Sequence, residues 1–148
     1  MSDAYRISVE IAAPPERVFD HFMEPTLLVR WMGDFAQLDA REGGLFRVDI
    51  NGVLIRGHYV RIDRPRLIEI AWGEAGNSDM PPGATRLRIE LIAHDGGTRL
   101  QLTHSGLVAS EASKHAIGWP HFLARLVTLA GGADPGPDPW AAPIVAPE

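Results

Sequence analysis

The sequence predicts an α+β fold in which a curved antiparallel sheet of six to seven strands wraps around one long C-terminal helix. Two short helices are expected directly after the first strand. Three observations support this order: a strand-like alternation at Arg6–Ala12, a period of two that dominates from Asp34 to Ser105, and a helical apolar stripe from Ser110 to Ala130. A sheet with one apolar face needs a cover, and the last helix is the only predicted element long enough to provide it.

The N-terminal quarter predicts a strand followed by two helices. Pro14 and Pro15 suit the first turn of a helix, where a missing N–H has no partner to lose, and Glu16 there complements the helix dipole. Pro25 should end this helix and begin the next one. The expected buried faces are Val18, Phe19, Phe22 and Met23 in the first helix and Leu27, Leu28, Trp31 and Met32 in the second.

The middle of the chain predicts antiparallel strands. Asn51-Gly52 is a strong signal for a two-residue hairpin turn, and it would pair Ile50 with Val53. Gly73–Gly83 is rich in glycine and proline, which predicts a loop long enough to be mobile. The expected strands are Phe35–Ala40, Leu45–Ile50, Val53–Ile62, Leu67–Trp72, Thr85–His94 and Thr98–Ser105.

The C-terminal third predicts a long amphipathic helix with a tail. Ser110 is the expected N-cap, Pro120 should kink the helix near Ala116, and Gly131-Gly132 should stop it. The domain therefore spans residues 1–132. Residues 133–148 form a tail rich in proline and glycine, expected to be extended or disordered, although Trp140 could dock on the domain.

Composition excludes several classes of function. The 148 residues carry a net charge of −5 and no cysteine, so neither nucleic-acid binding nor a thiolate site is expected. No histidine or carboxylate spacing fits a metal template, and no glycine-rich loop opens a helix, so we expect neither a metal nor a cofactor. Without a signal peptide or a membrane-spanning segment, the protein is expected to be cytoplasmic.

Several motifs resemble those of one known superfamily. The run Ala13-Pro14-Pro15-Glu16-Arg17-Val18-Phe19, the later Trp31, Gly57-His58-Tyr59 and Pro65-Arg66-Leu67 resemble the START-like, or Bet v 1-like (SRPBCC), superfamily. The segments Thr103-His104-Ser105-Gly106 and His115-Ala116-Ile117-Gly118-Trp119-Pro120 resemble the branch named after the activator of heat-shock protein 90 ATPase. The resemblance covers roughly residues 5 to 130 and implies a helix-grip fold with a cavity between the sheet and the last helix.

The expected ligand-binding residues come from segments whose inward faces should converge on such a cavity. Tyr59 and His104 are the expected polar contacts, with His104 also open to interpretation as a core histidine. Gly57 and Gly118 should leave space, and Phe22, Trp31 and Met32 should form a gate at the mouth. The full set is Phe22, Trp31, Met32, Tyr59, Trp72, His104, Trp119 and Leu123, with no catalytic residue assigned.

Three functions stay open at this point. The first is non-enzymatic binding of a small hydrophobic ligand; the second is a cyclase or dehydratase acting on a polyketide-like or aromatic substrate, which requires a titratable group in the cavity. The third is a chaperone-linked interaction module. The eukaryotic activator has a separate N-terminal domain for which this chain has no room, and this argues against a chaperone role.

A free sheet edge would allow two chains to pair as a homodimer.

Overall fold

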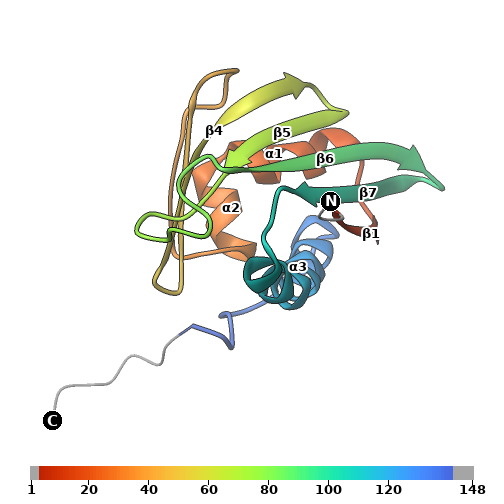
Figure 1. Cartoon of the computed structure of the whole chain (residues 1–148). Coiled ribbons are helices and arrows are strands. Elements are labelled where there is room, and N and C mark those ends of the chain that lie inside the picture. Colours follow the sequence, from red (N-terminus) through yellow and green to blue (C-terminus); the bar gives the residue numbers. More distant parts are fainter. Residues whose placement is uncertain (1–3, 142–148) are drawn as a thin grey trace, which may run out of the picture.

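The computed structural model describes residues 4–141 and confirms the predicted α+β helix-grip architecture. The elements are β1 (Tyr5–Ile11), α1 (Pro15–Met23), α2 (Pro25–Trp31), β2 (Phe35–Leu38), β3 (Leu45–Ile50), β4 (Val53–Asp63), β5 (Leu67–Trp72), β6 (Thr85–His94), β7 (Gly97–Ser105) and α3 (Ala109–Ala130). Figure 1 shows the curved sheet lying over α3. Along the chain, α1 and α2 follow β1 and precede the other six strands.

The sheet has seven strands in the order β1-β7-β6-β5-β4-β3-β2, and all neighbours are antiparallel. The chain's first strand therefore pairs with its last one, and β2 forms the opposite edge. Two hairpins are closed by two-residue turns, because Asn51 and Gly52 have φ of 51° and 91°, and Asp95 and Gly96 have φ of 48° and 78°. Positive φ at both central positions is the geometry that matches the twist of the paired strands.

The two short helices, α1 and α2, begin at the positions expected from the prolines in the sequence. Pro15 and Pro25 each occupy the first turn, and α2 follows α1 directly at Glu24. Their apolar faces join the inner face of the sheet in a single core, in which Trp31, Leu28 and Val18 are completely buried.

The start of α3 differs from the prediction. The helix begins at Ala109 with Val108 as N-cap and no side-chain capping bond, so the assignment of Ser110 as N-cap is wrong. The buried side chain of Leu107 anchors the chain just before the helix, and Ser110 Oγ instead donates to Asp79 at 3.4 Å. The helix continues through Pro120 to Ala130, and Gly131-Gly132 ends it.

The described part of the tail, residues 133–141, lies against α3. Arg125 donates from one terminal nitrogen to the Gly136 carbonyl at 2.8 Å, and His121 pairs with Asp138 at 2.8 Å. Asn51, in the β3–β4 turn, donates to the other oxygen of Asp138 at 3.3 Å. The Trp140 ring stacks on His121 of α3. The remaining predicted tail, residues 142–148, lies outside the described residues. Among residues 4–141, no helix is long and apolar enough to cross a membrane.

Candidate functional site

A cavity of about 250 Å³ opens between α3, the β3–β4 hairpin, the end of β5 and the loop that follows it. Most of its wall is apolar or aromatic, which is typical of small-molecule sites. The lining residues are Met32, Ile50, Val53, Ile55, Trp72, Glu74, Met80, Glu111, Lys114, His115, Gly118, Trp119 and Phe122.

Three of the eight predicted site residues line this cavity, namely Met32, Trp72 and Trp119. The other five, Phe22, Trp31, Tyr59, His104 and Leu123, are at most 2% exposed and belong to the core beside it. Of the predicted set, only the residues nearest to α3 and the β3–β4 hairpin border open space.

Phe22 and Trp31, two of the three residues expected to form a gate, pack against each other inside the core. Their ring centroids are 5.2 Å apart in an edge-to-face arrangement. The Trp31 indole N–H donates to the carbonyl of His21 at 3.1 Å, which fixes the ring away from the cavity wall. Of the three, only Met32 reaches the cavity.

Tyr59 has its hydroxyl engaged inside the core. The hydroxyl donates to the Phe22 carbonyl at 2.8 Å, and the ring meets Phe46 edge to face at 5.5 Å. Burial, followed by the negative charge of Asp39, raises the pKa of Tyr59, so the phenol stays protonated. The side chain ties α1 to the sheet.

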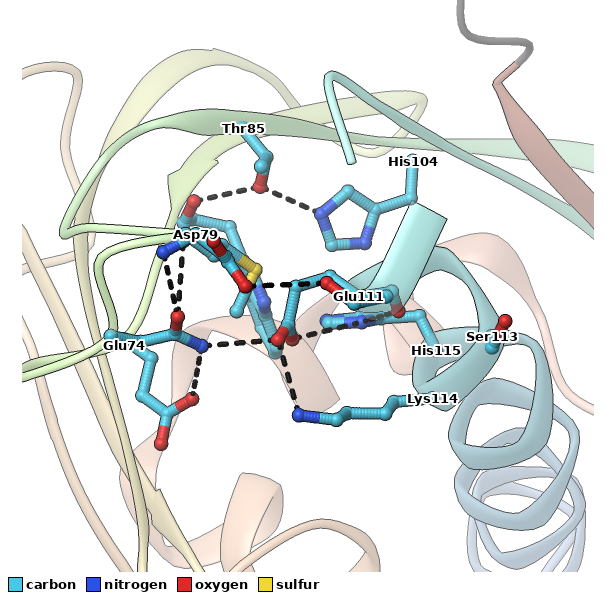
Figure 2. A network of polar contacts seen from close by, with 12 residues as sticks. Glu74, Asp79, Thr85, His104, Glu111, Ser113, Lys114 and His115 are labelled. Carbon is cyan, nitrogen blue, oxygen red and sulfur yellow. Dashed lines mark hydrogen bonds and ion pairs between the residues drawn. The ribbon is translucent and has the colours of Figure 1, made fainter. Parts of the chain in front are cut away.

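His104 is held in one neutral tautomer by three neighbours. Trp119 Nε1 can only donate, so His104 Nδ1 accepts at 3.1 Å and the ring proton lies on Nε2. Nε2 then donates to Thr85 Oγ1 at 2.8 Å, and the Thr85 hydroxyl donates to the Trp72 carbonyl at 2.7 Å. Burial, and secondarily the neighbouring His115, lowers the pKa of His104 to about 3. Both ring nitrogens are used within the core, and Figure 2 shows the contact between His104 and Thr85.

The two glycines expected to leave space behave differently. A Cβ at Gly118 would meet no atom within 4 Å, and this glycine does line the cavity. A Cβ at Gly57 would lie 1.7 Å from the Ala71 carbonyl oxygen, so the inference that Gly57 leaves a void is wrong. Gly57 is required because β4 and β5 approach closely there.

A polar network that the sequence analysis missed forms one wall of the cavity. Figure 2 shows Glu111, Lys114 and His115 on α3 facing the loop that carries Glu74. Asn77 joins the two elements, since its amide nitrogen donates to Glu74 at 2.9 Å and to Glu111 at 3.1 Å. The loop between β5 and β6 is therefore anchored on α3 at this point.

Glu111 is a buried carboxylate, with its side chain only 4% exposed. Burial alone would raise its pKa, but hydrogen bonds from Asn77 and Lys114 outweigh that effect and leave the pKa of Glu111 lowered. Lys114 Nζ lies 3.2 Å from the carboxylate. Glu111 is therefore an ionised group that is already neutralised by its neighbours.

His115 presents one ring nitrogen to the cavity. Nδ1 donates to the Glu111 carbonyl one turn earlier, at 2.7 Å. Burial lowers the pKa of His115, and the Glu111 carbonyl and carboxylate only partly oppose this. The neutral ring therefore carries a lone pair on Nε2, which has no hydrogen-bond partner among residues 4–141.

Trp72 carries an unused donor in the same wall. The residue is 2% exposed, and its Nε1 is a buried nitrogen without an acceptor in the described part of the chain. Leaving such a donor unpaired costs about 1–3 kcal/mol. The ring centroids of Trp72 and His115 are 6.3 Å apart, so these two rings border one small region.

The cavity-facing position of Glu111 and His115 could have been predicted from their spacing in the sequence. Glu111 and His115 are four positions apart and therefore lie on the same face of a helix. Because that face is the apolar stripe, both had to point toward the sheet. Across residues 4–141, no group of three or more His, Cys, Asp or Glu side chains could hold a metal ion.

The chain matches known proteins over nearly all of the fold. The model of the family described as Activator of Hsp90 ATPase homolog 1-like protein matches residues 12–131. The solution structure of an AHSA1-like protein from Rhizobium etli is 35% identical, with a TM-score of 0.74, 98% of this chain covered and 92% of that one. A comparison with curated proteins finds no relative.

Two more distant structures show the same fold. An Hsp90 activator from Plasmodium falciparum is 24% identical, with a TM-score of 0.74 and coverage of 88% of this chain and 97% of that one. The Aha1 dimer from Colwellia psychrerythraea is 20% identical, with a TM-score of 0.74 and coverage of 89% and 100%. With the family model matching most of its length, this chain belongs to the AHSA1 branch of the START-like, or Bet v 1-like (SRPBCC), superfamily.

Proposed function

We propose that this domain binds a small, largely apolar ligand in the cavity between the sheet and α3. The observation that carries the proposal is a cavity of about 250 Å³ whose wall combines aromatic and aliphatic side chains with a few polar groups. An apolar cavity of about 150 Å³ is large enough for benzene. The space here therefore suits a compound of one or two rings better than a diacyl lipid.

The enzymatic alternative relied on His104 and Tyr59 as titratable groups in the cavity. Both are buried in the core and hydrogen-bonded to protein atoms there. Neither side chain lines the cavity, so neither can exchange a proton with a substrate bound there. His115 is the histidine that lines the cavity, and we propose that it holds the ligand and that the domain binds without chemistry.

The alternative of a chaperone-linked interaction module can be compared with one similar structure. One relative is described as an Hsp90 activator, at an identity that carries the fold alone. A pull-down with purified Hsp90 tests this role, and pairing of two copies is tested by light scattering on the purified domain. A positive result in the pull-down, together with no ligand binding, would replace our proposal.

The direct test is native mass spectrometry of the full chain purified from cells, followed by thermal-shift measurements with a panel of one- and two-ring compounds. The blocking variant is Gly118→Leu, because a side chain at this position has open space in front of it and would fill the cavity. Ile117→Leu is the matched control, since Ile117 is 67% exposed on the adjacent position of α3.

We expect ligands to raise the melting temperature of the wild type and of Ile117→Leu but not of Gly118→Leu. Retention of all binding by a folded Gly118→Leu variant would place the ligand elsewhere. The absence of any co-purifying compound and of any thermal shift across the panel would overturn the proposed function.

A further inference from the structure

We propose that the ligand of this cavity is an uncharged ring compound with a hydroxyl group, and that this hydroxyl donates a hydrogen bond to His115 Nε2. The inference rests on the proposed function, because it concerns the same cavity and adds the chemical class of its occupant.

The first argument is the accessibility of His115 Nε2. This nitrogen makes no hydrogen bond with the described residues. Between residues 4 and 141, the only side-chain nitrogen or oxygen that is both fully buried and unpartnered is Trp72 Nε1. Because His115 Nε2 is also unpartnered but is not that atom, it must have accessible surface. Since His115 lines the cavity and its side chain is only 12% exposed, the nitrogen is reached from the cavity.

The second argument is the role that His115 can play. Its Nδ1–H is committed to the Glu111 carbonyl, so the neutral ring can only accept at Nε2. The charged or titratable groups around it are Glu111 and Lys114 on α3, Glu74 on the loop after β5, and His104 on β7. Burial holds the pKa of His115 below its ordinary value, which keeps this acceptor available at neutral pH.

The third argument is the kind of group that His115 can bind. The ring centroids of Trp72 and His115 are 6.3 Å apart, but the Trp72 indole N–H is fully buried and therefore closed to a ligand. His115 Nε2 can only accept, so the ligand must supply a donor. A hydroxyl group is a small uncharged substituent that donates a hydrogen bond, whereas a ketone or an ether cannot donate one.

The fourth argument is charge. Two carboxylates, from Glu74 and Glu111, border the cavity, and one ammonium group, from Lys114, pairs with Glu111. A ligand carboxylate or phosphate would enter a region that already has a negative balance. A ligand cation would lose hydration against a largely apolar wall, and the Glu111 carboxylate there is already paired with Lys114. An uncharged hydroxyl avoids both costs.

The test compares four probes of similar size on the full chain: 2-naphthol, 2-methylnaphthalene, 2-naphthoate and 2-naphthylmethylammonium. Affinities are measured by calorimetry at pH 7.5. We expect 2-naphthol to bind about tenfold more tightly than 2-methylnaphthalene, the ratio that about 1.4 kcal/mol of hydrogen bonding gives. The two ions should bind more weakly than 2-naphthol.

The decisive variants are at His115. His115→Phe removes the acceptor and should bring the ratio between 2-naphthol and 2-methylnaphthalene close to one, with the affinity for 2-methylnaphthalene retained. His115→Gln provides an amide oxygen and should restore part of the preference. Ala116→Ser is the matched control, since Ala116 is the exposed residue next to His115 on α3 and is not among the residues that line the cavity. Circular dichroism establishes that each variant is folded.

Equal binding of both probes, or a preference that survives His115→Phe, would overturn the inference and leave the proposed function standing. Tighter binding of either ion would also overturn it. If no probe binds and the broader panel fails as well, the proposed function itself fails.

Discussion

His121 and Trp140 stack face to face, with ring centroids 3.6 Å apart and planes within 10° of parallel. The same indole meets Phe122 edge to face at 5.7 Å, and Phe122 lines the cavity. Asp138 holds the tail in place, because its carboxylate contacts both His121 and Asn51. The described tail thus contacts both α3 and the β3–β4 turn.

The first prediction concerns this stacking. Trp140→Ala should lower the free energy of unfolding by about 1 kcal/mol, the range found for aromatic pairs. Urea denaturation measures the change. Pro139→Ala, at the exposed neighbouring position, is the control and should have a smaller effect. Equal stabilities for Trp140→Ala and the wild type would show that the stacking contributes nothing in solution.

The second prediction compares alanine substitutions at two glycines, for which we expect opposite effects on the stability of the fold. Gly57→Ala should destabilise the fold by about 3 kcal/mol, because its Cβ would meet the Ala71 carbonyl oxygen at 1.7 Å. Gly118→Ala should stabilise it by about 0.5–1 kcal/mol, since alanine favours the helix and meets no atom within 4 Å. Thermal denaturation of the pair gives both signs. A tolerated Gly57→Ala would mean that β4 and β5 separate easily.

The third prediction is a pH dependence that originates at His104. Its pKa is lowered to about 3 in the folded state, against about 6.5 when unfolded. Between these two pH values His104 binds a proton in the unfolded chain but not in the folded one. Its contribution to the free energy of unfolding is therefore fully present above pH 6.5 and is lost as the pH falls. This one group contributes a slope of about 1.4 kcal/mol per pH unit.

His104→Gln removes the titration while keeping an acceptor for Trp119 and a donor for Thr85. Urea denaturation between pH 7 and pH 5 should show a shallower loss of stability in this variant than in the wild type. Parallel curves for the two proteins would contradict a buried, neutral His104.

The fourth prediction concerns the amide that anchors the loop after β5. Asn77→Ala should expose the Glu74 and Met80 amides to faster hydrogen exchange and cost about 1–3 kcal/mol, because Asn77 donates to two carboxylates. Asn77→Asp should cost more, since it adds a third negative charge between Glu74 and Glu111. Ser78→Ala, on the exposed neighbouring residue, is the control and should leave the exchange rates unchanged.

Local chemistry explains why most of the fold was predictable. The Asn51-Gly52 pair, the prolines at positions 15 and 25 and the glycines after Ala130 each act on their own backbone, and each appears in the structure as expected. Such signals require no knowledge of residues that are distant along the chain.

The cavity was less predictable, because alternation separates the two faces of a sheet but not core from void. Tyr59 and Trp72 both point inward, yet one is enclosed by α1 and the other borders open space. That difference depends on where α1 and α3 lie on the sheet. Gly57 shows the same limit, since a glycine can mark an empty space or a backbone contact.

The pairing of β1 with β7 has a consequence for the synthesis of this protein on the ribosome. Tyr5 lies opposite His104, and among residues 4–141 β1 has no other neighbour in the sheet. During synthesis β1 must therefore wait for residues about 100 positions later before its inter-strand hydrogen bonds can form. Such non-local pairing is slow and leaves strand edges exposed in the meantime. The nascent chain should thus depend on protection from aggregation until nearly all of the domain has been translated.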